Sequence, residues 1–296
     1  ISAATPPYST VRYYWQTSSG GSSTAYGFAS TQTVTTSGTW YLRAFNTCSG
    51  IWGGSSAGVS VTIDAQPTAV NNTSTATICG GTSKALSGSG GTGTWSIVSG
   101  PGSISGSTYI PGAISSNATV TIRYTVVNGT CSDFDDVTFN VNAQPTITNT
   151  TSSAPICAVT SRSLSASTSG PGPISYAVLS GPGSISGNTY TAGAVSGAAS
   201  VTVRATITNG SCTDFSDVSF TVYQSPTYTG STASMCVGET RTLTATAPGT
   251  TFSGIGVSGN TFTAPDPGGV SGNYTITLTN GPCTSFIVLT VYATPT

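Results

Sequence analysis

The chain has 296 residues, a formal net charge of −1, and a charged fraction of only 5%, against about 25% in typical soluble domains. Its seven Lys and Arg residues exclude the basic patches that bind nucleic acid or anionic membranes, so no nucleic-acid partner is predicted. The longest apolar runs fall far short of the ~20 residues that a membrane-spanning helix needs.

One short sequence motif recurs along the chain, and each copy ends a run in which apolar and polar residues alternate. Its copies are VTIDAQPT (61–68), NVNAQPT (140–146), VYQSPT (222–227) and VYATPT (291–296). Each copy supplies a proline, at Pro67, Pro145, Pro226 and Pro295, and proline cannot continue a central strand. The spacing predicts four domains of small β-sandwich size. Their expected bounds are 1–66, 67–144, 145–225 and 226–296, and the first is expected to be incomplete at its N-terminus.

Alternating apolar and hydroxyl side chains predict strands throughout, as the third domain illustrates. Its expected strands are 161–167, 174–180, a hairpin over 184–193, 199–210 and 212–223. Asn209-Gly210 is a strong hairpin signal between the last two. With no helical periodicity, this pattern is typical of an all-β immunoglobulin-like sandwich. The octapeptide SGPGSISG, present at 99–106 and 180–187, is interpreted as a turn that the copied fold needs and not as a binding loop.

Six cysteines occupy repeated places, one early and one late in each of the last three domains. The recurring pairing predicts disulfides within domains, namely Cys79 with Cys131, Cys157 with Cys212, and Cys236 with Cys283. Cys48 is the late cysteine of the first domain, and its partner is expected upstream of Ile1; the alternative is a free or intermolecular thiol. Disulfides of this kind imply an oxidising compartment, outside the cell or on its surface.

Aromatic and charged residues also repeat. Trp15, Trp95, Tyr176 and Phe252 share one position and are predicted to lie in the domain cores. Arg123 and Arg204 are predicted to stand opposite Phe134 and Phe215, with Asp136 and Asp217 diagonal to them in cross-strand ion pairs. The cluster Asp133, Asp135 and Asp136 leaves calcium open as an alternative. Trp52, in a loop beside Cys48, is a candidate for stacking on a sugar or for covering its own domain.

The residues for common catalytic chemistry are missing. The chain has no histidine, so it lacks the commonest general base, the commonest zinc ligand and every Ser-His or Cys-His pair. GSSAG (54–58) matches a nucleophile elbow without a base, and GSGGTG (88–93) matches a dinucleotide fingerprint without a helix. We predict no catalytic residue, no cofactor and no metal site, and therefore no enzyme.

The segment 11–63, with VRYYWQTSSGGSST and SGTWYLRAFNTCSGIW, resembles the immunoglobulin-like repeats of very long surface and secreted proteins of Bacteroidetes. GTWSIVSGPGSISGSTY, TVTIRYTVVNG and CSDF in the later domains are similar to neighbouring immunoglobulin-like or PKD-like repeats. The resemblance implies a tandem array on an adhesin, a gliding-associated filament or a secreted multidomain protein, exported by the type IX system.

Two functions follow as hypotheses. The first is a non-catalytic, extracellular rigid stalk or filament, whose partners are neighbouring domains of the same chain, surface glycans or other copies of itself. The short linkers around each proline favour limited bending. The alternative is a carbohydrate-binding accessory module of a secreted enzyme, for which Trp52 and Trp40 would form an exposed aromatic platform.

Overall fold

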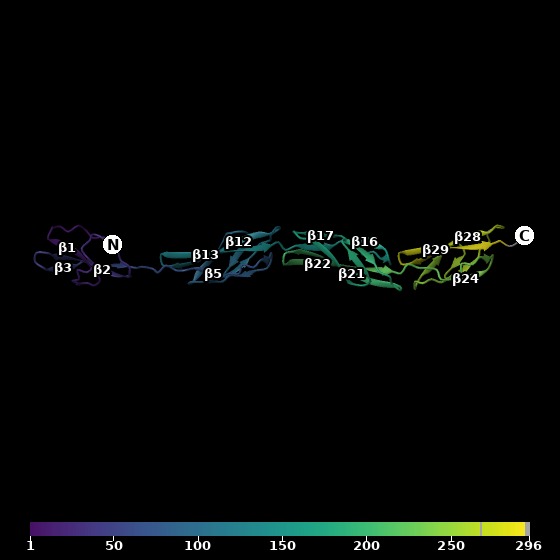
Figure 1. Ribbon diagram of the computed structural model, residues 1–296, viewed down its shortest axis with the longest axis horizontal. Coiled ribbons are helices and arrows are strands. Elements are labelled where there is room, and N and C mark those ends of the chain that lie inside the picture. The colour runs from purple at the N-terminus through teal and green to yellow at the C-terminus, as the bar shows by residue number, and fades with distance from the viewer. Residues whose placement is uncertain (267, 294–296) are drawn as a thin grey trace. The chain divides into compact units, whose positions relative to one another are not determined.

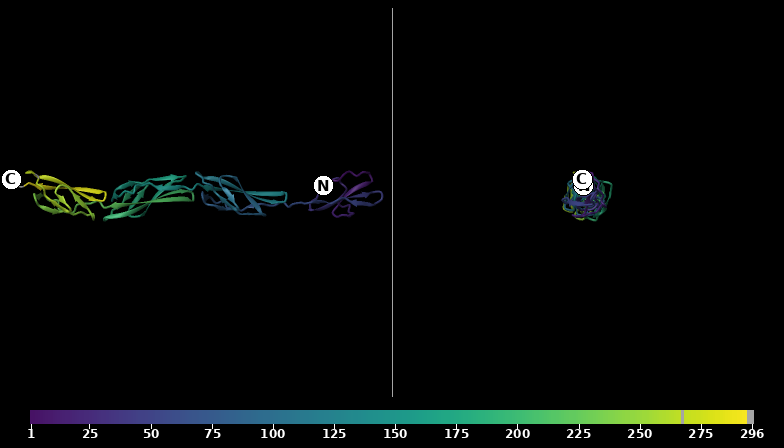
Figure 2. Two further views of the ribbon diagram at one scale, coloured as in Figure 1. Left: turned by 180° about the vertical axis from the view of Figure 1, so that it is seen from behind. Right: turned by 90° about the vertical axis from the view of Figure 1, so that its left-hand side faces the viewer.

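The structure, a computed structural model, describes residues 1–266 and 268–293. Residue 267 and the last three residues of the fourth predicted domain, Pro295 among them, lie outside the described residues. All regular elements described are β-strands, drawn as arrows in the left-hand view of Figure 2. The described part of the chain therefore has no helix that is long and apolar enough to cross a membrane. The predicted all-β class is confirmed.

The chain forms two compact units, each with its own internal contacts. The first consists of Ile1–Thr73, Ser87–Ser96 and Arg123–Val137, and the second of Ser74–Leu86, Ile97–Ile122 and Thr138–Thr296. The division runs through the second predicted domain, so the four domain boundaries stay a prediction. We call the segments 1–66, 67–144, 145–225 and 226–293 the first to fourth repeats.

The third repeat shows the topology most completely (Figure 1). One sheet has the order β15-β22-β21-β18, comprising Ile156–Cys157, Cys212–Tyr223, Ala198–Asn209 and Ile174–Ser180. A second sheet has the order β16-β20-β19, comprising Ser161–Ser163, Thr189–Ala192 and Gly183–Ser186, and β14 (Thr146–Asn149) pairs with β17 (Ala166–Ser169). Taken in chain order, these strands reproduce the ABED and CFG sheets of an immunoglobulin sandwich, with β15 added in parallel to the last strand.

The second and fourth repeats have the same strand order. In the second, the sheets are β6-β13-β12-β9 (Ile78–Cys79, Cys131–Asn142, Ala118–Asn128, Gly93–Ser99), β10-β11-β7 (Ser103–Ser105, Thr108–Ile110, Lys84–Ala85) and β5-β8 (Val70–Asn71, Gly88–Ser89). In the fourth, they are β23-β29-β28-β25 (Met235–Cys236, Cys283–Tyr292, Gly272–Asn280, Thr251–Ser253) and β24-β27-β26 (Thr240–Thr242, Thr261–Thr263, Val257–Ser258). The same strand order in all three repeats explains why the same sequence motifs recur in them.

The first repeat presents one sheet. β2 (Gly38–Asn46) lies between β1 (Val11–Gln16) and β3 (Trp52–Ser55), and its beginning pairs with β4 (Val59–Val61). Trp15 of β1 is buried, at 4% exposure, and its indole nitrogen donates to the Ala29 carbonyl at 3.2 Å. Trp95, Tyr176 and Phe252 are half-buried and pack against core clusters of their repeats, so the predicted core aromatic position is confirmed.

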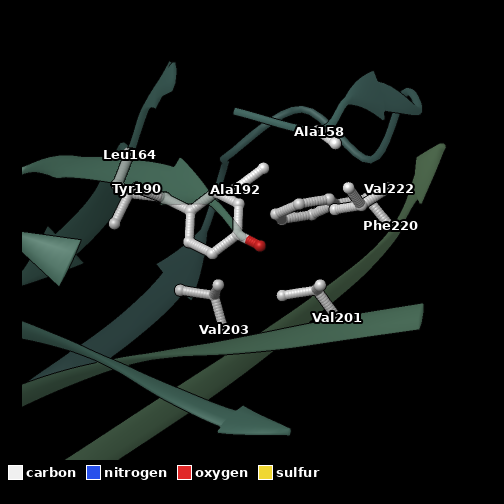
Figure 3. Packing of buried hydrophobic residues seen from close by; sticks show 8 residues of the cluster. All are labelled: Ala158, Leu164, Tyr190, Ala192, Val201, Val203, Phe220 and Val222. Atoms are coloured by element: carbon white, nitrogen blue, oxygen red, sulfur yellow. The ribbon is translucent and has the colours of Figure 1, made fainter. Parts of the chain in front are cut away.

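A different aromatic lies at the centre of the third repeat. Tyr190 is fully buried between Leu164, Val201, Val203 and Phe220 (Figure 3). Its hydroxyl donates to the carbonyl of Pro182, in the middle of the second SGPGSISG copy. In the first copy, the hydroxyl of fully buried Tyr109 donates to the Pro101 carbonyl at 2.6 Å. Each octapeptide is therefore a Gly-Pro-Gly turn, whose proline carbonyl accepts a hydrogen bond from a core tyrosine, followed by the short strand β10 or β19.

Candidate functional site

The motif Asn-Gly-x-Cys occurs at 128–131, 209–212 and 280–283, each time between the two longest strands of a repeat. Asn209 ends β21 and Cys212 begins β22, where the two are paired across the turn. Gly210 has a φ of 62°, a left-handed conformation that suits glycine. The sequence identified this motif only as a hairpin turn; the structure gives it a second role.

The asparagine of each motif binds the linker that ends the preceding repeat. Its side-chain amide donates to a backbone carbonyl two residues before the linker proline. The pairs are Asn128 with Ala65 (2.8 Å), Asn209 with Ala143 (2.7 Å) and Asn280 with Gln224 (2.9 Å). Each hairpin turn thus docks on the linker from the repeat before it, and we call this contact region a junction.

The glycine of each motif makes room for a side chain from the preceding repeat. A Cβ on Gly281 would lie 2.7 Å from the Tyr223 ring, and one on Gly129 would lie 1.9 Å from the Asp64 carboxylate. Both distances are shorter than real Cβ contacts, so a larger residue at either glycine would require the Tyr223 or Asp64 side chain, or the turn itself, to move. Asp64 also accepts from the Thr130 backbone nitrogen at 2.8 Å.

The cysteine of each motif has its sulfur against the same linker. The Sγ atoms of Cys131, Cys212 and Cys283 lie 3.5, 3.9 and 3.7 Å from the carbonyl oxygens of equivalent linker residues. These residues are Asp64, Asn142 and Tyr223. All three late cysteines therefore face the repeat before their own.

The disulfides join consecutive repeats, and the predicted pairing within repeats is wrong. Cys79 of the second repeat is bonded to Cys212 of the third, with their Cα atoms 5.6 Å apart. Cys157 of the third repeat is bonded to Cys283 of the fourth, with their Cα atoms 5.5 Å apart. The early cysteine of one repeat thus bonds the late cysteine of the next.

The physical reason lies in the length of the last strand. Cys157 stands beside Tyr223, the last residue of β22, whereas Cys212 is its first residue. Eleven steps along a strand (223 − 212) span about 36 Å at about 3.3 Å per residue. A disulfide needs Cα atoms within about 7 Å, so these two cysteines cannot bond. The same argument separates Cys236, beside Tyr292, from Cys283.

Three cysteines are free thiols: Cys48, Cys131 and Cys236. Cys131 and Cys236 were predicted to be bonded within their repeats, and that prediction is wrong. Cys131 faces the first repeat, where the sequence carries no cysteine beside the linker, and Cys236 is the early cysteine of the last repeat described. Both stand in places where equivalent cysteines form disulfides.

The repeated ion pairs exist, with a register two residues from the predicted one. Arg204 stands directly opposite Asp217, and its guanidinium donates two hydrogen bonds of 2.8 Å to that carboxylate. These bonds lower the pKa of Asp217 below its ordinary value. Phe215 is diagonal, with its ring centre 3.7 Å from the guanidinium carbon. The hairpin loop is Gly210-Ser211, one residue later than Asn209-Gly210, which moves the pairing by two.

The acidic cluster of the second repeat is used in backbone contacts. Asp133 accepts from the Ala69 nitrogen at 2.9 Å and Asp135 from the Asn71 nitrogen at 2.8 Å, while Asp136 pairs with Arg123. Among the residues that the structure describes, no group of three or more metal-ligating side chains comes together. Asp133 and Asp135 hold the segment that contains β5 beside β13, whereas Asp136 bonds β12, so the three carboxylates do not converge.

One repeated set of cations was missed in the sequence. Lys84, Arg162 and Arg241 share one position and donate to carbonyls of the loop before their strand, at Ala76, Ser152 and Ser231. Lys84 lies 4.7 Å from the Phe139 ring centre, and burial lowers the pKa of its amine. Their equivalent spacing from the early cysteines is the signal that could have found them.

The tryptophans proposed for glycan stacking lie within the first repeat. Trp40 is buried, at 6% exposure, and packs edge-on to Tyr26, so its expected exposed position is wrong. Trp52 is half-buried, with its ring centre 4.8 Å from that of Phe45 and 5.4 Å from that of Tyr14. Its role in ligand stacking stays a prediction.

Comparisons with known proteins give likeness at the level of fold. No protein family and no curated protein matches the sequence. Among solved structures, titin domains I67–I69 in an E-to-A variant are 12% identical, with a TM-score of 0.40 over 78% of this chain and 100% of that one. Sidekick-1 immunoglobulin domains 1–5 are 11% identical (TM-score 0.32; 97% and 74% covered), and extracellular domains 3–5 of Drosophila OTK are 10% identical (0.33; 78% and 97%). The assignment rests on the strand order of the second, third and fourth repeats: the chain is a tandem array of immunoglobulin-like β-sandwich repeats.

Proposed function

We propose that the chain is a non-catalytic extracellular segment that acts as a rigid stalk or filament of a bacterial surface adhesin or gliding-type protein. The observation that carries the proposal is the double link between the second and third repeats and between the third and fourth, since each of these pairs is joined by the linker and by a disulfide. Disulfides persist in oxidising environments, which supports an extracellular location. The resemblance of segment 11–63 to Bacteroidetes repeats supports the type of parent protein.

The two disulfides limit how far the chain can be stretched. The loops closed by Cys79–Cys212 and Cys157–Cys283 overlap, so the shortest covalent path from Cys79 to Cys283 passes through both disulfides. That path contains 55 residues (212 − 157), whereas the uninterrupted chain contains 204 (283 − 79). At about 3.5 Å per extended residue, the maximum span falls from about 700 Å to about 190 Å. A stalk so built resists lengthening even after its repeats unfold.

Single-molecule stretching of the full chain between terminal handles tests this function. We expect a contour length about 520 Å shorter in the oxidised protein than after reduction by dithiothreitol, corresponding to 149 residues (204 − 55). The variant Cys157→Ser/Cys283→Ser keeps one disulfide and should leave a path of 71 residues (283 − 212). Equal contour lengths with and without reductant would contradict the stalk proposal.

A further inference from the structure

In the second and third repeats, an aspartate of the last strand accepts a hydrogen bond from the first segment of the same repeat. Asp133 accepts from the Ala69 nitrogen and Asp214 from the Ile147 nitrogen, each at 2.9 Å. Both aspartates stand two residues after the late cysteine, and both nitrogens belong to the second residue after the linker proline. A carboxylate bound to this nitrogen is therefore a repeated feature of the fold.

The fourth repeat lacks this carboxylate. Its equivalent residues are Tyr228, the second after Pro226, and Ser285, the second after the late cysteine. The Ser285 hydroxyl donates to the Pro226 carbonyl at 2.6 Å. Ile287 likewise takes the place of Asp135, which in the second repeat accepts from a further backbone nitrogen of the first segment. The fourth repeat thus keeps the backbone donors but has no acidic side chain for them.

The backbone nitrogen of Tyr228 faces the last strand. Two hydrogen bonds flank this residue and pair its segment with the strand on the other side, from Thr229 to Thr244 and from Thr246 to Thr227, both at 2.9 Å. In an antiparallel pair, a residue between two such bonds turns its own N–H away from the partner strand. Within residues 1–266 and 268–293, no atom accepts a hydrogen bond from the nitrogen of Tyr228 or of Gly230.

A cavity of about 260 Å³ lies where these donors meet the last strand, and all of its lining residues are uncharged. One positive charge stands next to it. Arg241 donates to the Ser231 carbonyl at 2.8 Å, and the Tyr228 hydroxyl donates to the same oxygen at 3.1 Å. Burial raises the pKa of Tyr228, and the charge of Arg241 opposes that rise. Backbone donors beside a cation favour an anionic ligand.

The side chains of the cavity also indicate what carries the anionic group. The lining combines hydroxyl groups with rings: Thr227, Thr232, Ser285, Pro226, Tyr228 and Phe286. Phe286 is 70% exposed. Its equivalents Phe134 and Phe215 lie under arginines, with ring centres 3.6 and 3.7 Å from the guanidinium carbon, but the fourth repeat has Thr275 at that arginine position. Hydroxyl groups and uncovered rings match the hydroxyls and C–H faces of a sugar.

We propose that this cavity is a binding site for an acidic sugar, a hexuronate such as galacturonate. Its carboxylate takes the place that Asp133 and Asp214 occupy in their repeats and accepts from the Tyr228 nitrogen. Such a charge-assisted hydrogen bond is stronger than one between neutral groups. The site adds ligand recognition to the fourth repeat and is separate from the mechanical role proposed above.

The test is a titration of the full chain, labelled with nitrogen-15, with sodium galacturonate at constant ionic strength. We expect saturable shifts of the Tyr228 and Gly230 amide signals. Galactose, which has a hydroxymethyl group in place of the carboxylate, should bind at least about 10-fold more weakly. Ser285→Asp supplies the carboxylate of the other repeats and should weaken galacturonate binding at least about 10-fold. Thr284→Asp adds the same charge at the exposed neighbouring residue and should leave binding unchanged.

The proposal is wrong if galacturonate gives no saturable shift, or if galactose binds equally well. Unchanged binding by a folded Ser285→Asp protein would also overturn it. If that variant does not fold, the comparison of the two sugars decides alone. A blocked aspartate, N-acetyl-aspartate amide, tests the other source of a carboxylate. If it shifts the same signals at lower concentration than galacturonate does, the occupant is an acidic peptide side chain and the sugar proposal fails.

Discussion

Asn209 donates its side-chain amide to the carbonyl oxygen of Ala143, 66 residues earlier in the chain, at 2.7 Å. The same amide donates to the Asn117 side chain at 2.8 Å, and Asn209 is 8% exposed. Asn209→Ala should lower the free energy of unfolding by about 1–3 kcal/mol, because the carbonyl of buried Ala143 loses this donor, while the Asn117 side chain still accepts from the Ala143 nitrogen. Urea unfolding measures this. Asn188→Ala, in an exposed turn, is the control and should change stability by less than about 0.5 kcal/mol; equal losses would refute a junction role for Asn209.

Val159 is the only non-glycine residue with positive φ in the described chain, at 57°. It follows Cys157 by two residues, where the other repeats have Gly81 and Gly238 with φ of 85° and 79°. Its side chain is 76% exposed, so little packing offsets the strain. Val159→Gly should raise the free energy of unfolding by about 1 kcal/mol. Thermal unfolding beside Val159→Ala, which keeps a Cβ and much of the strain, checks this; a lower melting temperature for the glycine variant would contradict it.

The hydroxyl of Tyr190 holds the Pro182 carbonyl, and burial raises the pKa of this phenol. Tyr190→Phe should cost about 1–2 kcal/mol, since the ring stays and one part-buried carbonyl loses its donor. The fourth repeat has Phe262 at the same place and no GPG turn, so it shows that the ring alone suffices for folding. Tyr190→Leu is the comparison and should cost more, because the core also loses ring contacts. Denaturant unfolding that finds Tyr190→Phe neutral would show that the turn does not need the bond.

The two ion pairs make the stability of the folded protein depend on pH. Hydrogen bonds from Arg123 and Arg204 lower the pKa values of Asp136 and Asp217. A lowered folded-state pKa stabilises the fold above the ordinary aspartate pKa of about 3.9, and this contribution is lost as pH falls through the folded value. We expect the melting temperature to drop below about pH 4. Asp136→Asn/Asp217→Asn should flatten that drop; an unchanged profile would mean that other carboxylates cause it.

Substitution of Trp52 distinguishes a packing role from a ligand-binding role in the first repeat. Its contacts with Phe45 and Tyr14 predict that Trp52→Ala costs about 2 kcal/mol, less than a fully buried tryptophan. The glycan-binding alternative expects that the wild-type chain gives signals on a glycan array and that the variant, checked for folding by circular dichroism, loses them. Absence of signal from the wild-type chain would contradict that alternative.

Local patterns in the sequence predicted most of the strands. Alternation placed the long strands of the third repeat at 199–210 and 212–223, against Ala198–Asn209 and Cys212–Tyr223 in the structure. The core position of Trp15, Trp95, Tyr176 and Phe252 was also found, because repeated aromatics at one place in a strand reflect a copied core. The register was missed by two residues, since Asn-Gly fixes where a hairpin turns but not which residues form its loop.

The sequence by itself determined that this protein is a tandem all-β array that contains disulfides and no histidine, because composition, alternation and period act locally along the chain. Only the tertiary structure decided how the cysteines pair. Pairing within each repeat and pairing between consecutive repeats recur with the same period, so periodicity cannot distinguish them. The two cysteines of the third repeat, Cys157 and Cys212, lie at opposite ends of a strand of about 36 Å and cannot bond each other. The Asn-Gly turn instead brings Cys212 to Cys79 of the repeat before it.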